Sequence, residues 1–177
     1  RPITYIETYL ASEGFLAYKN RQDPAVTITF PLLDDAGAET GEVLLAWTTT
    51  PWTLPSNLAC AVGPDIAYAK MLDHSDGKTY ILAEARLGAY AKELKDAEQV
   101  GTVTGSELAG RHYTPLFPYF SAHTNAFVVA TADYVSTEDG TGIVHIAPAF
   151  GEEDKVVTDA LGIDVVNPVD QRGRFTS

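Results

Sequence analysis

The chain has 177 residues, enough for one domain with its own hydrophobic core and at most a small appendage. Hydrophobic residues make up 45% of it and charged residues 20%, without a low-complexity tract, so we expect a folded domain rather than a disordered segment. Twelve basic against 24 acidic residues give a formal charge of -12, which argues against broad contact with a nucleic acid backbone, so we expect a nucleic acid partner to be contacted only locally.

No apolar run approaches the length of a membrane span, and the chain begins at Arg1 without a signal peptide. We therefore expect no membrane partner and a cytoplasmic location. A single cysteine, Cys60, excludes an internal disulfide, and its apolar neighbours predict a small buried side chain. We interpret residues 1–177 as one domain that forms a piece of a longer protein.

The first part of the chain predicts a helix and a hairpin. Apolar side chains recur at helical spacing over residues 2–12. Residues 26–32 alternate between apolar and polar side chains, which is the pattern of a half-buried strand. The turn-forming residues 34–41 then lead to the apolar run 43–46, and the two strands are expected to pair.

A second hairpin, a helix and another strand are predicted in the middle of the chain. Residues 66–72 and 78–83 flank a turn rich in Asp, Ser and Gly. Leu and Tyr side chains at helical spacing over residues 84–95 predict a helix that lies against the sheet. A further strand follows near residues 99–104.

The last part of the chain adds a loop, three strand-like segments and one helix. Gly and Pro interrupt the apolar residues 105–120, which predicts a loop that packs as a lid or wall. Residues 127–135, 143–148 and 165–166 are strand-like, and residues 151–161 are a predicted helix. Many strands at short spacing with few helices favour a mainly β fold with peripheral helices, a closed or nearly closed β-barrel.

A hydroxyl-rich segment follows the apolar run that ends at Ala46. Two prolines in it fix the backbone angle φ and remove two amide donors, so the segment cannot continue a central strand or a helix. A simpler alternative is an edge strand, since Thr and Trp are common in strands and proline is tolerated at sheet edges. The segment consists of Trp47, Thr48, Thr49, Thr50, Pro51, Trp52, Thr53, Leu54, Pro55, Ser56 and Asn57.

Several common kinds of site find no support in the sequence. The trio Gly140, Thr141 and Gly142 leads into a strand and lacks the third glycine of a dinucleotide-binding loop, so we do not expect phosphate binding there. The four histidines show no metal-ligand spacing, and no glycine-flanked serine of the nucleophile-elbow type occurs. We therefore expect no metal, no other cofactor and no covalent catalysis.

A second polar feature lies in the last third of the chain. His145 interrupts an apolar strand, and Asp154 follows nine residues later in the first turn of a predicted helix. Taken singly, the first is typical of a buried core histidine and the second of a carboxylate that the helix dipole favours. Only their combination with the hydroxyl-rich segment points to a site.

Together, residues 47–57 and 140–154 resemble the editing domain inserted into the class I aminoacyl-tRNA synthetases for branched aliphatic amino acids. The second motif reads Gly-Thr-Gly-Ile-Val-His-Ile-Ala-Pro-Ala-Phe-Gly-Glu-Glu-Asp. Weaker similarity extends the resemblance over most of residues 23–176, whereas residues 1–22 match nothing that we can place. His145 favours the isoleucyl branch, because valyl relatives tend to carry a lysine and leucyl relatives a methionine there.

The resemblance implies a β-barrel that hydrolyses the ester between mischarged valine and the 3′-terminal adenosine of tRNA(Ile), with valyl adenylate as a second substrate. The implied partners are that adenosine, the valine moiety and the rest of the parent synthetase in cis. A synthetic pocket for isoleucine cannot strongly reject a ligand smaller by one methylene, a difference known from this enzyme family to be worth about 1 to 3 kcal/mol. Because neither ATP-binding signature of class I, His-x-Gly-His or Lys-Met-Ser-Lys-Ser, occurs in the chain, we expect no amino acid activation.

Matching positions also imply the site residues. The threonines would position the ribose and an attacking water, Asp154 would hold the substrate ammonium, and His145 with Trp52 would shape the side-chain pocket. The implied catalytic residues are Thr48, Thr49, Thr50, His145 and Asp154, and the implied substrate-binding residues are Trp47, Trp52, Asn57, His145 and Asp154.

Two alternatives stay open. An editing domain of the valyl type would hydrolyse threonyl-tRNA(Val), although His145 speaks against it. A non-catalytic module would bind tRNA ends or dock to the parent synthetase without turning over any ester.

Overall fold

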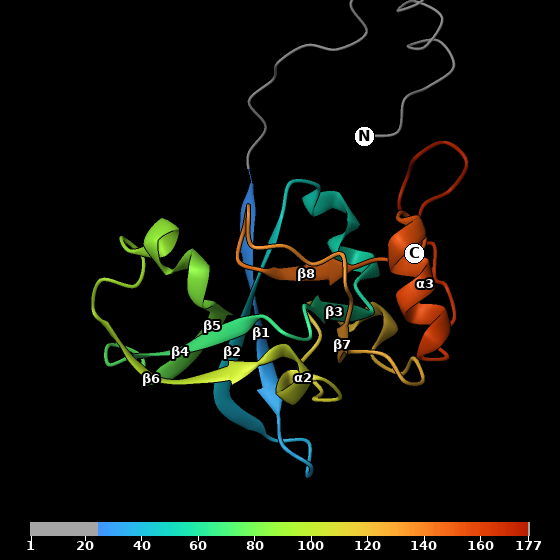
Figure 1. Ribbon diagram of the computed structural model, residues 1–177. Coiled ribbons are helices and arrows are strands. Elements are labelled where there is room, and N and C mark those ends of the chain that lie inside the picture. Colours follow the sequence, from blue (N-terminus) through green and yellow to red (C-terminus); the bar gives the residue numbers. More distant parts are fainter. Residues whose placement is uncertain (1–24, 177) are drawn as a thin grey trace, which may run out of the picture.

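The first hairpin is confirmed. In the computed structural model, which describes residues 25–176 (Figure 1), strand β1 (Val26–Leu33) pairs antiparallel with strand β2 (Glu39–Thr48). Alternate side chains of β1 are buried, with Phe30 opposite Leu44, as the alternating sequence predicts. The helix predicted over residues 2–12 lies outside the described residues.

Three antiparallel strands form a meander at one side of the sheet. Strand β4 (Ala67–Asp73) lies between β5 (Lys78–Ala83) and β6 (Ala97–Thr104), which confirms the second hairpin and the strand after it. The segment predicted as a helix over 84–95 forms the 3₁₀ helix η2 (Glu84–Tyr90) followed by turns. Leu87, Tyr90 and Leu94 pack on a cluster of buried side chains, so the expected packing against the sheet is found: Leu45, Ala69, Met71 and Leu82.

Three short buried strands form the other side. Strand β3 (Ala59–Val62), which the sequence pattern did not single out, lies between β7 (Val128–Thr131), parallel to it, and β8 (Ile143–Ile146), antiparallel to it. Strand β7 is shorter than the predicted span of 127–135 because the chain turns at Ala132. All four residues of β3 are fully buried and belong to the main hydrophobic core.

The mainly β fold with peripheral helices is confirmed, whereas the sheet is open rather than a closed barrel. The hydrogen-bonded order is β6-β4-β5-β2-β8-β3-β7, and β1 pairs with β2 beside this path. Strands β2 and β8 share a single pair, Trp47 and Val144, because β2 ends one residue later at Thr48. Between β1 and β7, residues 110–114 make only isolated bridges, so the strands curl without completing a continuous ladder.

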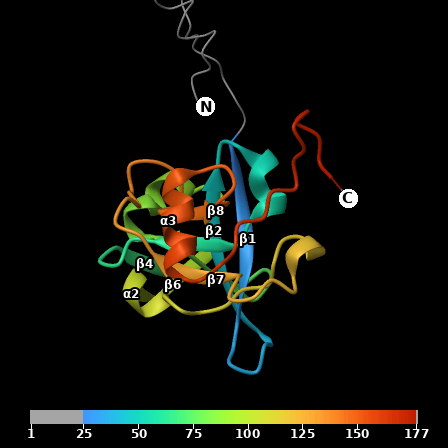
Figure 2. The same ribbon diagram turned by 90° about the vertical axis from the view of Figure 1, so that its right-hand side faces the viewer.

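The remaining helices are short. Helix α3 (Glu152–Ala160) lies at the side of the molecule away from the β4–β5–β6 meander (Figures 1 and 2) and confirms the helix predicted over 151–161. The strand predicted at 165–166 is wrong, since these residues have no strand partner. Within residues 25–176, no helix has the length and apolar character needed to cross a membrane. The short helices of the described residues, apart from η2, are η1 (Pro51–Ser56), α2 (Gly105–Leu108), η3 (Pro118–Phe120) and α3 (Glu152–Ala160).

Candidate functional site

A pocket of about 300 Å³ brings together most of the residues singled out from the sequence. It lies where the end of β2, helix η1, strand β8 and the start of α3 meet. Six predicted site residues line it, Trp47, Thr48, Thr49, Thr50, His145 and Asp154, together with Thr53, Val144, Ala147 and Phe150.

Within the hydroxyl-rich segment, strand β2 ends at Thr48 and residues 51–56 form the 3₁₀ helix η1, so the edge-strand alternative is wrong and the expectation that the segment cannot be helical does not hold for this short helix. Pro51 occupies the first helical turn, where its missing amide is tolerated, and the amide of Thr53 donates to the carbonyl of Thr50 over 3.1 Å. Because a 3₁₀ helix has three residues per turn, Thr50 and Thr53 lie on one edge and both reach the pocket. The Thr48 hydroxyl accepts a hydrogen bond from the Thr50 amide over 3.0 Å, which fixes the backbone just before the helix. Thr49 and Thr50 are exposed.

His145 is buried, with 7% of its surface exposed, and both of its ring nitrogens are engaged. The Asn57 amide nitrogen lies 3.0 Å from Nδ1, and the Thr53 hydroxyl lies 2.8 Å from Nε2. The hydroxyl of Thr53 donates to the carbonyl of Thr50 over 3.0 Å, so it is an acceptor toward the ring. We therefore assign the neutral tautomer with the proton on Nε2.

The charge state of His145 agrees with that assignment. Burial lowers the pKa of the imidazole from 6.5 to about 4. The ring is therefore uncharged at neutral pH, and with both nitrogens bonded inside the protein it presents mainly carbon to the pocket. It is suited to act as a wall rather than as a proton acceptor.

Asn57 lies behind His145 and is not among the pocket-lining residues. Its amide nitrogen donates to the carbonyl of Ala59 over 2.9 Å as well as to the ring, and its carbonyl oxygen accepts from the Tyr113 hydroxyl over 2.7 Å. The side chain is therefore fully used inside the core. The expected contact between Asn57 and a substrate stays a prediction, and the geometry gives this residue a supporting position.

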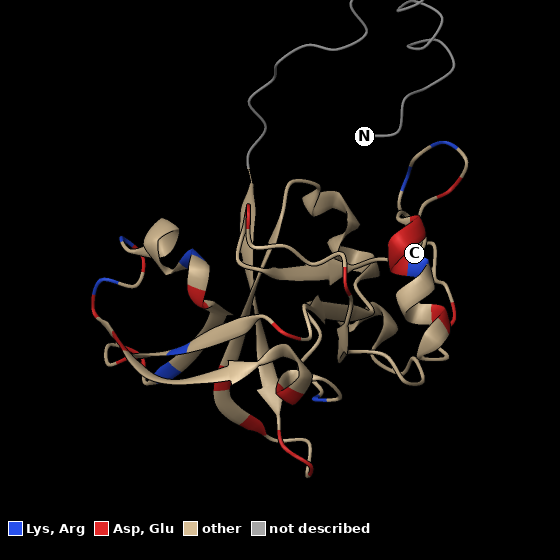
Figure 3. Ribbon diagram, viewed as in Figure 1, with Lys and Arg blue, Asp and Glu red and all other residues tan. Residues whose placement is uncertain are grey.

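Asp154 supplies the one carboxylate among the pocket-lining residues. It is half-buried, and its Oδ2 accepts the amide of Ala147 over 2.8 Å, which ties the start of α3 to the end of β8. Burial raises the pKa of this carboxyl, and hydrogen bonds from the Ala147 amide and the Tyr134 hydroxyl oppose that shift. A carboxylate can accept about four hydrogen bonds, so it retains capacity for a cationic donor. Acidic residues gather at the start of α3 (Figure 3), which favours a cation there over a phosphate.

The two tryptophans of the motif have different positions. Trp47 lines the pocket and packs on Gly140, where an added Cβ would lie 2.8 Å from its ring and where φ is +62°, so glycine is required at that turn. Trp52 is 51% exposed and is not a lining residue. The rings of Trp52 and Phe150 pack edge to face at a centroid distance of 4.8 Å, so Trp52 supports the pocket from outside.

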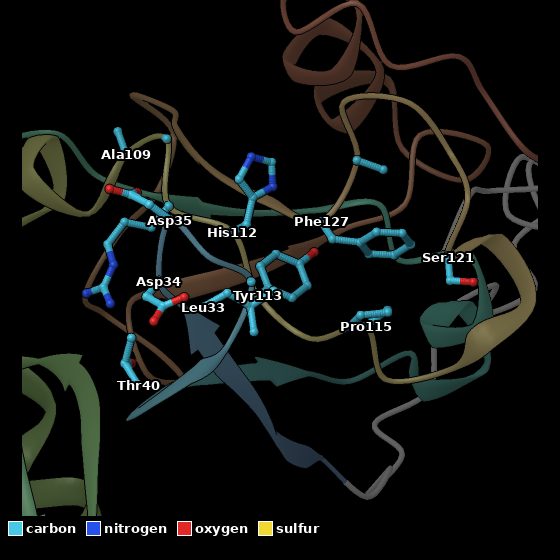
Figure 4. Close-up of a pocket in the computed structure, with 14 residues that line it drawn as sticks. Leu33, Asp34, Asp35, Thr40, Ala109, His112, Tyr113, Pro115, Ser121 and Phe127 are labelled. Atoms are coloured by element: carbon cyan, nitrogen blue, oxygen red, sulfur yellow. The ribbon is translucent and has the colours of Figure 1, made fainter.

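A larger hollow of about 890 Å³ lies elsewhere, between the β1–β2 turn and the segments 109–115 and 121–127 (Figure 4). None of the predicted site residues lines this hollow. The buried residue Tyr113 is one of its lining residues. The described residues also contain no group of three or more His, Cys, Asp or Glu side chains that could hold a metal ion.

Sequence comparison relates the chain to isoleucine-tRNA ligases. No protein-family model matches it. It is 53% identical over 174 residues to the isoleucine-tRNA ligase of Corynebacterium diphtheriae, covering 91% of this chain and 16% of that protein. The Mycobacterium tuberculosis enzyme is 54% identical, covering 89% of this chain and 15% of that protein, and the Rickettsia canadensis enzyme is 48% identical, covering 99% and 16%. The chain thus spans about a sixth of the length of these relatives.

Structural comparison gives the fold. The GlLeuRS-CP1 structure matches with a TM-score of 0.62 at 18% identity, covering 80% of this chain and 66% of that chain. The editing domain of the P. knowlesi cytosolic leucyl-tRNA synthetase matches with a TM-score of 0.59 at 15% identity, covering 74% and 59%. The chain is a relative of the isoleucine-tRNA ligases with the fold of a synthetase editing domain. The comparisons confirm the resemblance that the two motifs indicated, namely to the isoleucyl branch of the synthetase editing domains.

Four lining residues were not predicted, namely Thr53, Val144, Ala147 and Phe150. Thr53 could have been found, because Pro51 at a first helical turn places residues three apart on one edge. The quoted motif places His145 close to Val144, Ala147 and Phe150. Where a strand ends beside the start of a helix, such side chains can face a pocket. Tyr113 has no local signal, because its partner Asn57 lies 56 residues earlier in the chain.

Proposed function

We propose that this isoleucyl-type editing domain removes wrongly attached valine from tRNA(Ile) by hydrolysing its ester to the 3′-terminal adenosine. The observation that carries the proposal is a single pocket in which exposed threonine hydroxyls, one carboxylate and a neutral histidine face the same space. A free amino group, a short apolar side chain and an ester bonded to ribose are the three parts that such a pocket can accommodate.

The carboxylate of Asp154 would bind the ammonium of the aminoacyl group. Its Oδ2 is fixed by the Ala147 amide, so the carboxyl group has a set direction before the substrate arrives. The site is half-buried, where a charge pair is stronger than in bulk water. A bound ammonium would also favour the ionised carboxyl and offset the rise in pKa that burial causes.

The neutral ring of His145 would limit the size of the side chain. Both nitrogens are held by protein groups, so the ring cannot turn aside without losing two hydrogen bonds. Isoleucine exceeds valine by one methylene, and forcing extra volume against a fixed wall typically costs about 1 to 3 kcal/mol. Valine would fit and isoleucine would be rejected.

Thr49 and Thr50 are exposed residues that line the pocket, and their hydroxyls would position the ribose and the attacking water. Water adds to the ester carbonyl carbon, the bond to the ribose oxygen breaks, and that oxygen takes up a proton as the free hydroxyl forms. No pocket-lining group is a ready general base, since His145 is engaged and Asp154 would pair with the ammonium. Most of the rate acceleration would come from orientation, with the neighbouring ribose hydroxyl assisting the proton transfer.

The test is deacylation of three esters by the purified chain: valyl-tRNA(Ile), isoleucyl-tRNA(Ile) and threonyl-tRNA(Val). The proposal expects rapid loss of valine from the first and little change in the others. Preferential release of threonine would assign the valyl-type activity instead. Binding of tRNA without release of any amino acid would assign a non-catalytic module.

A further inference from the structure

Tyr113 is fixed in the core by contacts on every side. The amide of Tyr113 donates to the carbonyl of Phe127 over 3.0 Å, and its neighbours in segment 110–114 bond to β1, which places the residue between β1 and β7. Its ring lies 4.9 Å from that of Phe30 and 6.1 Å from that of Phe127, measured between centroids. Figure 4 shows the ring beside Phe127, and only 1% of the residue is exposed. Its hydroxyl therefore has a defined position.

A continuous series of hydrogen bonds runs from this hydroxyl to the pocket. Tyr113 donates to the Asn57 carbonyl oxygen over 2.7 Å, and the Asn57 amide nitrogen contacts Nδ1 of His145 at 3.0 Å. On the far side of the ring, Nε2 and the Thr53 hydroxyl are 2.8 Å apart, and Thr53 donates to the Thr50 carbonyl. Every donor along the series meets an acceptor, so a donating Tyr113 hydroxyl, the observed orientation of the Asn57 amide and the Nε2–H form of His145 agree with one another.

The amide of Asn57 is the element that has two possible orientations. In the observed one its oxygen meets a donor, and its nitrogen meets two acceptors, the Ala59 carbonyl and His145. If the amide turned over, its oxygen would face the Ala59 carbonyl, an acceptor, and would offer the ring an acceptor in place of a donor. Burial raises the pKa of Tyr113 well above 10, so its hydroxyl keeps the proton that this arrangement requires.

We propose that Tyr113 is a positioning residue for substrate selection, which acts through Asn57 to hold His145 in its Nε2–H form against the pocket. The proposal rests on the proposed function, since it explains how the wall that separates valine from isoleucine is kept in place. Tyr113 itself touches no substrate, because it lies on the far side of Asn57 from the pocket.

The variant Tyr113→Phe removes the hydroxyl and keeps the ring. The Asn57 oxygen then loses the Tyr113 hydroxyl, one of the two contacts that orient the amide, the other being the Ala59 carbonyl, so the amide and with it His145 are held less firmly. We expect the ratio of valyl-tRNA(Ile) to isoleucyl-tRNA(Ile) deacylation to fall about tenfold, mainly because the isoleucyl ester is hydrolysed faster. A merely structural role would slow both esters together and leave the ratio unchanged, which would overturn the proposal.

Tyr68→Phe is the matched control. Tyr68 is equally buried, its hydroxyl accepts the Gly63 amide over 2.9 Å and donates to the Gly142 carbonyl over 2.7 Å, and these contacts do not include Asn57 or His145. We expect this variant to keep the selectivity ratio of the unmodified chain. An equal fall of the ratio in both variants would contradict a specific role of Tyr113.

The decisive second readout is the nitrogen NMR spectrum of His145 in the unmodified chain. The proposal expects a protonated Nε2 and an unprotonated Nδ1 there, and a mixture of tautomers in Tyr113→Phe. A proton on Nδ1 in the unmodified chain would overturn the proposal even where Tyr113→Phe does not fold. If the expected tautomer were found but the chain hydrolysed no ester, the proposed function would be contradicted. The hydrogen-bonded series from Tyr113 to His145 would still stand.

Discussion

The wall of the pocket, which is His145 with Asn57 and Tyr113 behind it, and the mouth of the pocket are built in opposite ways. In the wall, His145, Asn57 and Tyr113 are buried and use their hydrogen-bonding groups on one another. At the mouth, the Thr49 and Thr50 side chains are exposed, and the half-buried Asp154 keeps capacity for a further partner. The difference separates shape from binding: a saturated wall can exclude a ligand, whereas only unsaturated groups can hold one.

This contrast assigns different consequences to substitutions in the two regions. Loss of a mouth group should remove affinity for any ester, because the ligand loses a partner. Loss of a wall group should change which ester is accepted. Substitutions in the two regions, together with a pH titration, test that separation.

Asp154→Ala should abolish deacylation of valyl-tRNA(Ile) while the domain stays folded. The bound ammonium would be left without its partner in a half-buried site, which costs about 3 to 5 kcal/mol of binding if water is excluded. Asp154→Asn should fail as well, since an amide does not replace the charge. Steady-state deacylation with circular dichroism as a folding check measures both.

The control for Asp154 is Glu152→Ala, which removes an exposed acid from the same first helical turn without changing a pocket-lining residue. It should retain near-normal turnover. If Asp154→Ala retained it too, the carboxylate would serve only the helix terminus, and the ammonium would have to bind elsewhere.

The buried wall should also be visible in the pH dependence of unfolding. The pKa of His145 is about 4 in the folded chain against 6.5 ordinarily, so the unfolded chain binds more protons between these values. The free energy of unfolding should therefore fall as the pH is lowered through this window, by about 3 kcal/mol in total. Asp154, whose folded pKa is raised, acts in the opposite direction near the lower end.

Denaturant unfolding of the chain and of His145→Gln at a series of pH values isolates this contribution, because the carboxyl groups are common to both proteins. The difference between their stabilities should be largest above pH 6.5 and shrink toward pH 4. A constant difference would show that His145 titrates normally and that the wall is open to water.

The smallest effect is expected for Trp52→Ala. Trp52 is exposed and packs on the lining residue Phe150 in an edge-to-face aromatic contact, which is worth about 0.5 to 1.5 kcal/mol. Turnover of the valyl ester should fall by about tenfold at most, with selectivity preserved. Tyr119→Ala, another exposed aromatic outside the pocket lining, is the control. Gain of isoleucyl hydrolysis in Trp52→Ala would place Trp52 in the wall after all.

Much of the fold follows from local patterns in the sequence. The alternation over 26–32 predicts β1, and the turn between 72 and 78 predicts the β4–β5 hairpin, because period-two patterning and turn chemistry act over neighbouring residues. Helix η2 was assigned the wrong type, since Leu87 and Tyr90 are three apart and fit a 3₁₀ turn as well as an α-helix. The open sheet depends on where strands stop pairing, which spacing does not determine.

The site divides in the same way. The mouth and the histidine of the wall were predictable, because the threonines, Asp154 and His145 lie within two continuous motifs. The support behind His145 was not, because Tyr113 reaches Asn57 across 56 residues and β3 carries no pattern beyond being apolar. Asn57 was predicted from its motif to bind substrate, and only the folded structure shows its two ends occupied.

The central claim, that a saturated histidine wall excludes isoleucine, is tested most directly by parallel deacylation of valyl-tRNA(Ile) and isoleucyl-tRNA(Ile) by His145→Ala. The cost of overpacking, about 1 to 3 kcal/mol, would vanish, so hydrolysis of the isoleucyl ester should rise by roughly tenfold to hundredfold. His112→Ala, an exposed histidine at the other hollow, should leave both rates unchanged. A uniform loss on both esters, without any gain on the isoleucyl ester, would contradict the account.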